Sequence, residues 1–287
     1  MKTGWIGLGA MGEPMAGHLL DHGHLAAVWN RSGEKAKKFA SERQGVTAAD
    51  SPAALAAEVD VICLCVSADD DLREVVSAMR DSLRAGQVVI DHSTVAPATA
   101  RQLAADLAEL GVAFIDAPVT GGVEGAKNGQ LAIMAGGEKE DVERVRTVMD
   151  SYARVMHHLG PSGAGQSAKA VNQLMVAGIA EAVCESLALM ERLDLPREPM
   201  LELLGGGAAG NWFLDKRGRT MLEDSYQTGF DPRLLLKDLK ICDHLCREAG
   251  FDSAVLAQAL DDYQRLIDGG ETGRDISALY RIKSRQA

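Results

Sequence analysis

The chain has 287 residues, of which 46% are hydrophobic and 25% are charged, with a formal net charge of −11. This is the composition of a globular protein, and the length allows one large domain or two ordinary ones. The negative charge argues against a nucleic acid or an anionic membrane as partner, and we expect neither a signal peptide nor a membrane span, since no apolar run approaches 18 residues.

Short apolar runs alternate with amphipathic stretches in the first half of the chain. Most runs are continuously apolar, as in parallel strands that are covered on both faces. The expected strands are 3–6, 25–29, 59–66, 88–91, 113–116, 131–135 and 155–159. The expected helices are 11–22, 53–58, 72–83, 97–110 and 139–152. Strand–helix repetition of this kind predicts a Rossmann-like, doubly wound α/β sheet.

The pattern changes after Gly165, where strand signals stop. Residues 166–193 contain no proline and carry apolar residues at helical spacing, which predicts a helix about 40 Å long. Further helices are expected over 198–204, 212–222, 234–249 and 253–267. The sequence therefore predicts an α/β domain over 1–163 and an all-α domain over 164–287, joined by the long helix.

A glycine-rich segment separates the first expected strand from the first expected helix. Gly7, Gly9 and Gly12 match the pattern G-x-G-x-x-G. The first glycine allows a tight turn, the second a close approach of the backbone to a pyrophosphate, and the third close packing of helix on sheet. Free N–H groups at the helix start suit the phosphates. We expect a dinucleotide to contact Gly7, Leu8, Gly9, Ala10, Met11 and Gly12.

The end of the second expected strand bears on the choice of dinucleotide. It reads Asn30-Arg31-Ser32 and lacks the acidic residue that usually binds the ribose hydroxyls of NAD. Arg31 and Ser32 suit a 2′-phosphate, so we expect a preference for NADP(H). Alternatively, Arg31 only stacks on the adenine, which would leave NAD(H) usable as well.

Two further segments carry groups suited to a small substrate. Thr120-Gly121-Gly122 follows an expected strand, and its consecutive N–H groups suit a carboxylate, although a plain tight turn would look the same. Lys169 lies near the start of the long helix, with Asn172 three residues later on the same helical face. A lysine placed to move a proton, in a chain that also binds a hydride carrier, indicates a dehydrogenase.

The cysteines and histidines give no sign of a metal site. The five cysteines are odd in number and lack the spacing of a disulfide scaffold, which favours a reducing, cytoplasmic location. Cys242 and Cys246 are four residues apart, but no nearby set completes four ligands, and the seven histidines have no metal-ligand spacing. We therefore expect no bound metal.

Together these motifs resemble the β-hydroxyacid dehydrogenase family, which includes 3-hydroxyisobutyrate dehydrogenase and tartronate semialdehyde reductase. The resemblance extends over nearly the whole chain and includes the segments 91–94, 163–165 and 237–239. It implies that Lys169 is the catalytic lysine, that Thr120, Gly121 and Gly122 bind the substrate carboxylate, and that Asn172 orients the substrate.

The same resemblance implies roles for four other residues. Val66, Thr94 and Lys237 are expected to contact the cofactor, while Asn211 is expected to reach the far end of the substrate. An alternative for Lys237 and Asp238 is an ordinary exposed charge pair on an amphipathic helix, and Asp238 is left out of the site. There are two departures: Thr120 stands where the family often has Ser, and Ser67-Ala68 replaces a more usual Leu-Pro-type loop ending.

We therefore expect an NADP(H)-preferring reductase of small aldehyde or keto acids that works reversibly. The Asn30-Arg31-Ser32 signature resembles the branch of the family that uses NADPH to reduce glyoxylate or succinic semialdehyde, and tartronate semialdehyde is a third candidate. Alternatives are an NAD-dependent 3-hydroxyisobutyrate or other 3-hydroxyacid dehydrogenase, an imine reductase, a phosphogluconate-decarboxylating enzyme and a non-catalytic dinucleotide-binding module. The family also implies a homodimer or a homotetramer.

Overall fold

The protein is described by a computed structural model that covers residues 1–227 and 229–285. The chain forms two compact units, Met1–Lys169 and Ala170–Ala287. The sequence predicted a boundary at residue 163, whereas the structure counts the first turn of the long helix with the first unit. The two units are described separately below.

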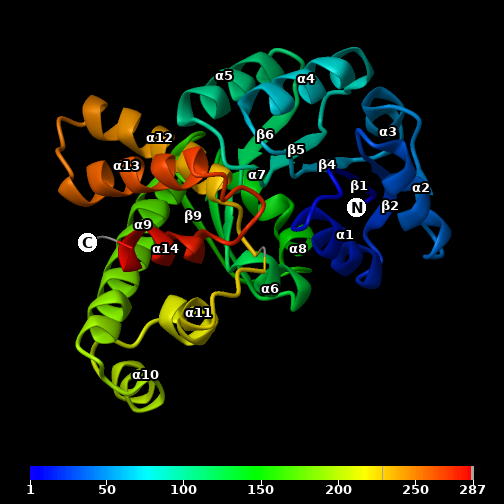
Figure 1. Ribbon diagram of the computed structural model, residues 1–287. Helices are drawn as coiled ribbons and strands as arrows, with labels where there is room; N and C mark the ends of the chain where they lie inside the picture. The colour runs from blue at the N-terminus through cyan, green and yellow to red at the C-terminus, as the bar shows by residue number, and fades with distance from the viewer. Residues whose placement is uncertain (228, 286–287) are drawn as a thin grey trace. The chain divides into compact units, whose positions relative to one another are not determined.

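The first unit is built on one sheet with the strand order β3-β2-β1-β4-β5-β6-β8-β7, in which β9 also pairs with β8. The strands from β3 to β6 pair in parallel, β8 runs antiparallel to β6 and β7, and β9 is parallel to β8. The predicted doubly wound fold is thus confirmed (Figure 1). The strands are β1 (Thr3–Ile6), β2 (Leu25–Trp29), β3 (Thr47–Ala48), β4 (Val61–Leu64), β5 (Val88–Asp91), β6 (Ala113–Asp116), β7 (Val119–Thr120), β8 (Leu131–Gly136) and β9 (Ala153–Gly160).

The helices of this unit agree with the predicted ones except where the apolar pattern is weak. The sequence missed α2, which buries only Ala36 and Phe39, as well as the short α6 and the two-residue strands β3 and β7. The predicted helix over 139–152 is broken at Val145 into two pieces. The helices are α1 (Gly12–Asp21), α2 (Gly33–Ser41), α3 (Pro52–Glu58), α4 (Asp69–Met79), α5 (Pro97–Ala108), α6 (Gly122–Lys127), α7 (Lys139–Arg144) and α8 (Arg146–Met149).

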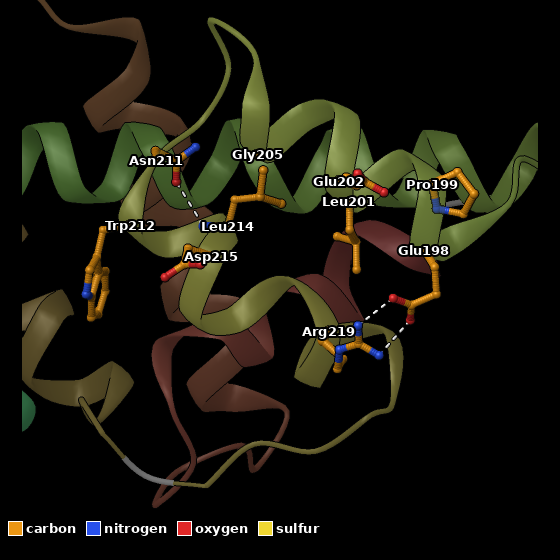
Figure 2. A pocket seen from close by; sticks show the side chains of 10 residues that line it. All are labelled: Glu198, Pro199, Leu201, Glu202, Gly205, Asn211, Trp212, Leu214, Asp215 and Arg219. Atoms are coloured by element: carbon orange, nitrogen blue, oxygen red, sulfur yellow. Dashed lines mark hydrogen bonds and ion pairs between the residues drawn. The ribbon is translucent and has the colours of Figure 1, made fainter.

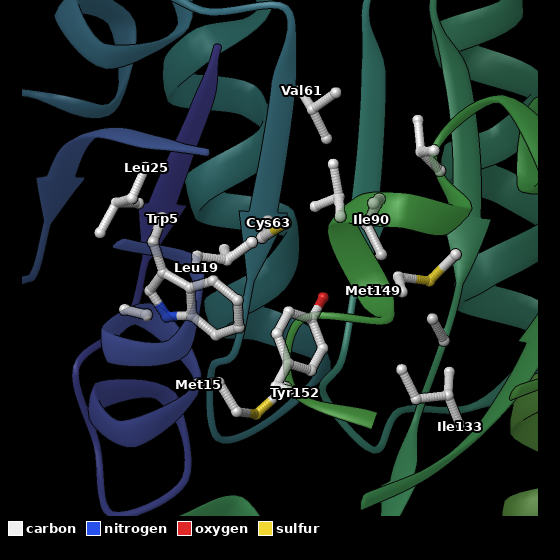
Figure 3. Close-up of a cluster of buried hydrophobic side chains, with 14 of the residues drawn as sticks. Trp5, Met15, Leu19, Leu25, Val61, Cys63, Ile90, Ile133, Met149 and Tyr152 are labelled. Carbon is white, nitrogen blue, oxygen red and sulfur yellow. The ribbon is translucent and has the colours of Figure 1, made fainter. Parts of the chain in front are cut away.

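An aromatic cluster lies at the centre of one of the two apolar clusters of this unit (Figure 3). The His92 ring stacks on Trp5 with 5.6 Å between centroids and meets Tyr152 edge-on. Its Nδ1 lies 2.7 Å from the Ala117 carbonyl oxygen and its Nε2 lies 2.7 Å from the Tyr152 hydroxyl. Burial lowers the pKa of His92 to about 4, so the ring is neutral at neutral pH.

The second unit is all helical. Its helices are α9 (Ala164–Arg192), which begins in the first unit, α10 (Arg197–Gly206), α11 (Trp212–Leu222), α12 (Pro232–Glu248), α13 (Ala254–Asp268) and α14 (Leu279–Ser284). Helix α9 buries small residues such as Ala177, Ala180 and Cys184, which permits close packing. The side chain of Asp231 caps α12, and Pro232 occupies its first turn.

A buried ionic cluster ties α14 into this unit. Lys283 is 3% exposed, and its Nζ lies 2.6 Å from Glu181, 2.8 Å from Glu185 and 2.7 Å from Asp262. Burial raises the pKa of Glu181, and the hydrogen bond and positive charge of Lys283 each lower it by a smaller amount. The lysine thus balances carboxylates of two other helices, α9 and α13.

Helix α9 is long and apolar enough, by length and composition, to cross a membrane. Half of its most apolar window is buried within the protein, and buried core helices meet the same criterion. The sequence showed no uninterrupted apolar run of this length because polar residues such as Asn172 and Gln173 are spaced along the helix.

Candidate functional site

The glycine loop after β1 has three glycines in three different environments. Gly7 has a φ of +99°, and a side chain there would collide with the Cys65 carbonyl. A side chain on Gly12 would collide with the carbonyl of Gly7, so this glycine permits α1 to begin close to the strand. At Gly9, by contrast, no atom of the described residues other than its neighbours in the chain lies within 4 Å of the Cβ position. The loop therefore fits a dinucleotide, whose pyrophosphate can approach the backbone at Gly9.

The end of β2 is fixed to this loop by Asn30. The Asn30 side-chain oxygen accepts a hydrogen bond from the Leu8 N–H at 2.8 Å, and its amide nitrogen donates to the Ser32 carbonyl at 3.1 Å. Asn30 was predicted to contact the cofactor, but both polar atoms of its side chain form hydrogen bonds within the protein. Ser32 is exposed at the start of α2, and the Arg31 side chain is 76% exposed and paired with Asp71. Asp71 was not predicted from the sequence as the partner of Arg31.

The loops that carry Val66 and Thr94 are held together by Ser93. Its hydroxyl accepts a hydrogen bond from the Val66 N–H at 2.9 Å. Gln166 is 1% exposed and holds the backbone on both sides of Thr94. Its side-chain oxygen accepts a hydrogen bond from the Val95 N–H at 3.1 Å, and its amide nitrogen donates one to the Ser93 carbonyl at 2.8 Å. The two predicted cofactor contacts therefore belong to one hydrogen-bonded assembly that includes the first turn of α9.

Asp116, at the end of β6, anchors the start of α9. Its fully buried carboxylate accepts from Gly163 N–H at 2.8 Å and from Gln166 N–H at 2.9 Å. Burial raises the pKa of Asp116, and these hydrogen bonds oppose the shift. A side chain on Gly165 would collide with the carbonyls of Asp116 and Met134, which explains the glycine in this turn. The helix start is thereby fixed against the sheet.

Lys169 follows one turn later and reaches the predicted carboxylate loop. It is 7% exposed, and its Nζ donates a hydrogen bond to the Val119 carbonyl at 2.9 Å. Val119 directly precedes Thr120, with which it forms β7, and Gly121 follows with a φ of +125° and Gly122 with +63°. The structure thus brings Lys169 to the loop formed by Thr120, Gly121 and Gly122.

In the second unit, Asn172 belongs to a chain of polar contacts. The Asn172 amide donates to the Gln173 side-chain oxygen at 2.8 Å, and the Gln173 amide donates to Asp238 at 2.7 Å. The other oxygen of Asp238 lies 3.1 Å from Lys237 Nζ. Asp238 is 4% exposed, which contradicts the alternative of an ordinary exposed charge pair at these two residues. Because the Asn172 nitrogen is used by Gln173, its oxygen is the end oriented by this chain to accept a hydrogen bond.

Asn211 has a local structural role. Its side-chain oxygen caps α11 by accepting from Leu214 N–H at 2.9 Å, and its nitrogen donates to the Ala209 carbonyl at 2.8 Å. It lines a cavity of about 850 Å³ between α10 and α11 (Figure 2). The other lining residues are Glu198, Pro199, Leu201, Glu202, Gly205, Trp212, Leu214, Asp215 and Arg219. Carboxylates dominate its charged groups, which disfavours an anionic substrate.

Comparisons with known proteins agree with this geometry. Residues 2–160 match the family described as the NAD binding domain of 6-phosphogluconate dehydrogenase, and residues 163–283 match the family described as NAD-binding of NADP-dependent 3-hydroxyisobutyrate dehydrogenase. The chain belongs to the β-hydroxyacid dehydrogenase family. This family comprises NAD(P)-dependent hydroxyacid dehydrogenases, so the predicted family is confirmed.

Three relatives illustrate the range of this β-hydroxyacid dehydrogenase family. The chain is 36% identical to a probable 3-hydroxyisobutyrate dehydrogenase-like protein of Arabidopsis thaliana, with coverage of 97% of this chain and 84% of the relative. It is 30% identical to an NAD-dependent L-serine dehydrogenase of Pseudomonas aeruginosa, with coverage of 98% and 97%. The solved structure of Mycobacterium tuberculosis 3-hydroxyisobutyrate dehydrogenase with L-serine is 28% identical, covers 98% of both chains and has a TM-score of 0.86.

In each unit, buried polar residues that the sequence did not single out hold the predicted site residues in place. Asp116, Gln166 and Asp238 each bind a group more than 40 positions away in the chain. A sequence signal existed only for Asp116, which begins the glycine-containing segment after β6. Across residues 1–227 and 229–285, no group of three or more His, Cys, Asp or Glu side chains is arranged to hold a metal ion.

Proposed function

We propose that this protein is an NADP(H)-preferring oxidoreductase that reduces small aldehyde or keto acids to hydroxyacids, reversibly. The candidate substrates are glyoxylate, succinic semialdehyde and tartronate semialdehyde. The observation that carries the proposal is the buried amine of Lys169 beside the Thr120–Gly122 loop, in the same unit as the glycine loop after β1.

Each group of the chain has a distinct task in this reaction. NADP(H), when bound, supplies or accepts the hydride. Lys169 donates a proton to the carbonyl oxygen in reduction and takes it from the hydroxyl in oxidation. The N–H groups of Gly121 and Gly122, with the Thr120 hydroxyl, hold the carboxylate, and Asn172 orients the reacting oxygen. Acid–base catalysis of this kind contributes about 10²–10⁴ in rate.

The cofactor preference is supported by the end of β2. Arg31 and Ser32 offer a guanidinium and a hydroxyl to a 2′-phosphate, and no acidic residue follows the strand directly. The matched family description also names an NADP-dependent enzyme. Two observations favour the alternative of an NAD-dependent 3-hydroxyacid dehydrogenase: Arg31 is paired with Asp71, and the Pseudomonas aeruginosa relative uses NAD.

The protein is further proposed to act in the cytoplasm as a homodimer or homotetramer, without a nucleic-acid or membrane partner. Large apolar side chains of α9 and the turn after it are exposed, among them Val171, Met175, Leu189 and Leu193. Exposed apolar residues that repeat along one helix are typical of a protein–protein interface. The net charge of −11 supports the absence of a nucleic-acid partner.

A steady-state comparison tests the proposal. NADPH and NADH oxidation is measured with glyoxylate, succinic semialdehyde, tartronate semialdehyde and a neutral aldehyde of similar size. We expect the acids to give a higher kcat/KM than the neutral aldehyde, and NADPH a higher value than NADH. Reduction of the neutral aldehyde at an equal kcat/KM would contradict the carboxylate site. A higher kcat/KM with NADH would overturn the cofactor preference, and no activity with any substrate would favour the non-catalytic module.

A further inference from the structure

An ion pair joins the two segments on either side of the glycine loop after β1: the loop after β2 and the first turn of α4. Arg31, which follows β2, places its Nη1 2.8 Å from Oδ1 of Asp71 in the first turn of α4. The Asp71 side chain is 27% exposed, whereas that of Arg31 is 76% exposed. The carboxylate is therefore the better fixed partner of the two.

The sheet register places this pair across the carboxyl end of β1. Ile6, the last residue of β1, is paired with Trp29 of β2 on one side and with Leu64 of β4 on the other. The chain leads from Trp29 to Arg31 and from Leu64 to the first turn of α4, so the ion pair connects the two flanking segments. The glycine loop begins between them, at Gly7.

This is the end of the sheet at which a doubly wound fold binds its dinucleotide, with the adenosine ribose near the end of the second strand. Asn30 fixes that strand end to the loop through the Leu8 N–H. Arg31 therefore lies where a 2′-phosphate is bound, and its guanidinium already has an anionic partner there.

We propose that Asp71 determines how strongly the protein distinguishes NADP(H) from NAD(H), by competing with the 2′-phosphate for Arg31. This inference rests on the proposed function in taking Arg31 as the 2′-phosphate ligand. A 2′-phosphate must share the guanidinium with Asp71 and is also repelled by its negative charge. NAD(H) has no such phosphate and leaves the ion pair intact. Asp71 therefore weakens the preference for NADP(H) and keeps NAD(H) usable.

The test is equilibrium binding to the whole protein, measured by calorimetry without any redox reaction. The ligands are NADP⁺ and NAD⁺, together with adenosine 2′,5′-bisphosphate and 5′-AMP as fragments with and without the 2′-phosphate. In Asp71→Asn, we expect the Kd ratio of NAD⁺ to NADP⁺ to rise about three- to tenfold, as for removal of one screened like charge. The ratio of the two fragments should shift in the same direction, while the Kd of 5′-AMP stays within about twofold of the wild-type value.

Asp70→Asn is the matched control. Asp70 is exposed in the same turn of α4, so its loss has the same effect on the helix dipole without removing the partner of Arg31. It should change the Kd ratio less than twofold. Asp71→Ser, which keeps a polar side chain near the helix start, repeats the test should Asp71→Asn fold poorly.

A second pair of variants tests whether Asp71 acts through Arg31. In an Arg31→Ala background, Asp71→Asn should change the ratio much less than it does in the wild type. An unchanged ratio in the single variant would overturn the proposal. A reduced ratio would also overturn it, because Asp71 would then orient Arg31 for the phosphate. Failure of the proposed reaction would instead leave these binding ratios as expected, so the two failures are distinguishable.

Discussion

Gln166 holds the backbone on both sides of Thr94, and it does so from the first turn of the helix that carries Lys169. The proposed cofactor-side loop and the proposed proton donor are therefore parts of one buried assembly. Because Asp116 fixes the Gln166 N–H in turn, the relative positions of these groups are set by hydrogen bonds to the end of β6.

Replacement of Gln166 by Leu should lower turnover more than it weakens cofactor binding. The change leaves the Val95 N–H and the Ser93 carbonyl without their partner, at a cost of about 1–3 kcal/mol for each buried group. We expect kcat to fall at least about tenfold and the hydride-transfer isotope effect to increase, since donor and acceptor are no longer held in register. The kcat and isotope effect are measured with NADPH and its deuterated form.

Ser167→Ala is the control for this variant. Ser167 is the next residue on α9, and its hydroxyl donates only a local hydrogen bond, to the Gly163 carbonyl at 2.9 Å. Its removal should leave kcat and the isotope effect close to the wild-type values. Equal losses in the two variants would indicate that Gln166 serves general stability instead.

Replacement of Lys169 by Ala should abolish most of the activity and spare the cofactor site. We expect kcat to fall by about 10²–10⁴, the usual contribution of a positioned acid or base. The Kd of NADP⁺ should stay near the wild-type value, because the glycine loop lies on other elements of the unit. Stopped-flow measurement of hydride transfer at saturating substrate checks the first value and calorimetry the second. Near-normal turnover would rule out the acid–base role.

His92 should make the protein less stable in mild acid. Burial lowers its pKa from 6.5 to about 4, so the unfolded chain binds the proton more readily than the folded protein does. The contribution of His92 to the free energy of unfolding is thus fully present above pH 6.5 and is lost as the pH falls toward 4. Between pH 7 and pH 5 the expected loss is about 2 kcal/mol.

A His92→Gln variant isolates this effect. Its free energy of unfolding in urea should be lower than that of the wild type at pH 7, because the contacts with Ala117 and Tyr152 are disturbed. It should then fall by about 2 kcal/mol less than the wild type between pH 7 and pH 5. Parallel pH profiles for the two proteins would assign the acid sensitivity to other groups.

Replacement of Lys283 by Met should destabilise the second unit. The lysine balances Glu181, Glu185 and Asp262, and its loss removes the cation beside the buried Glu181, whereas Asp262 keeps its contact with Arg265. Removing one partner of a buried ion pair typically costs about 3–5 kcal/mol. Urea unfolding followed by circular dichroism measures the cost. Lys240→Met, at an exposed position of α12, should cost less than about 0.5 kcal/mol.

A second substitution should recover part of that loss. Glu181→Gln, introduced together with Lys283→Met, removes one of the carboxylates that the lysine balances. The double variant is therefore expected to be more stable than Lys283→Met alone. If the double variant is the less stable of the two, packing rather than charge explains the effect of Lys283.

The parts of the site that depend on local chain geometry were predictable. The G-x-G-x-x-G spacing predicted the glycine loop, and the structure gives Gly7, Gly9 and Gly12 the three expected environments. Lys169 and Asn172 were predictable as one helical face because the pattern over 166–193 is helical throughout. Such features need only the spacing of residues along the sequence.

The remaining parts depend on contacts between distant segments. The Asn30 oxygen binds Leu8, 22 positions away, and Gln173 binds Asp238, 65 positions away. Nothing in the composition near Asp238 shows that this side chain is buried, so an exposed pair stayed open as an alternative. Asn211 was ambiguous for a different reason. An asparagine that directly precedes a helix can cap that helix or bind a ligand, and the sequence does not distinguish these two roles.

One continuous helix passes from the first unit to the second between Lys169 and Ala170. An insertion or deletion of a single residue between Lys169 and Asn172 would turn the following helix face by about 100°. A deletion would place the Asn172 amide on the opposite side of the helix from the Lys169 amine, and an insertion would move it to the other flank of the same face. Homologous enzymes that share this chemistry should therefore vary in length within loops such as 207–210 and 269–274, but keep this three-residue interval constant.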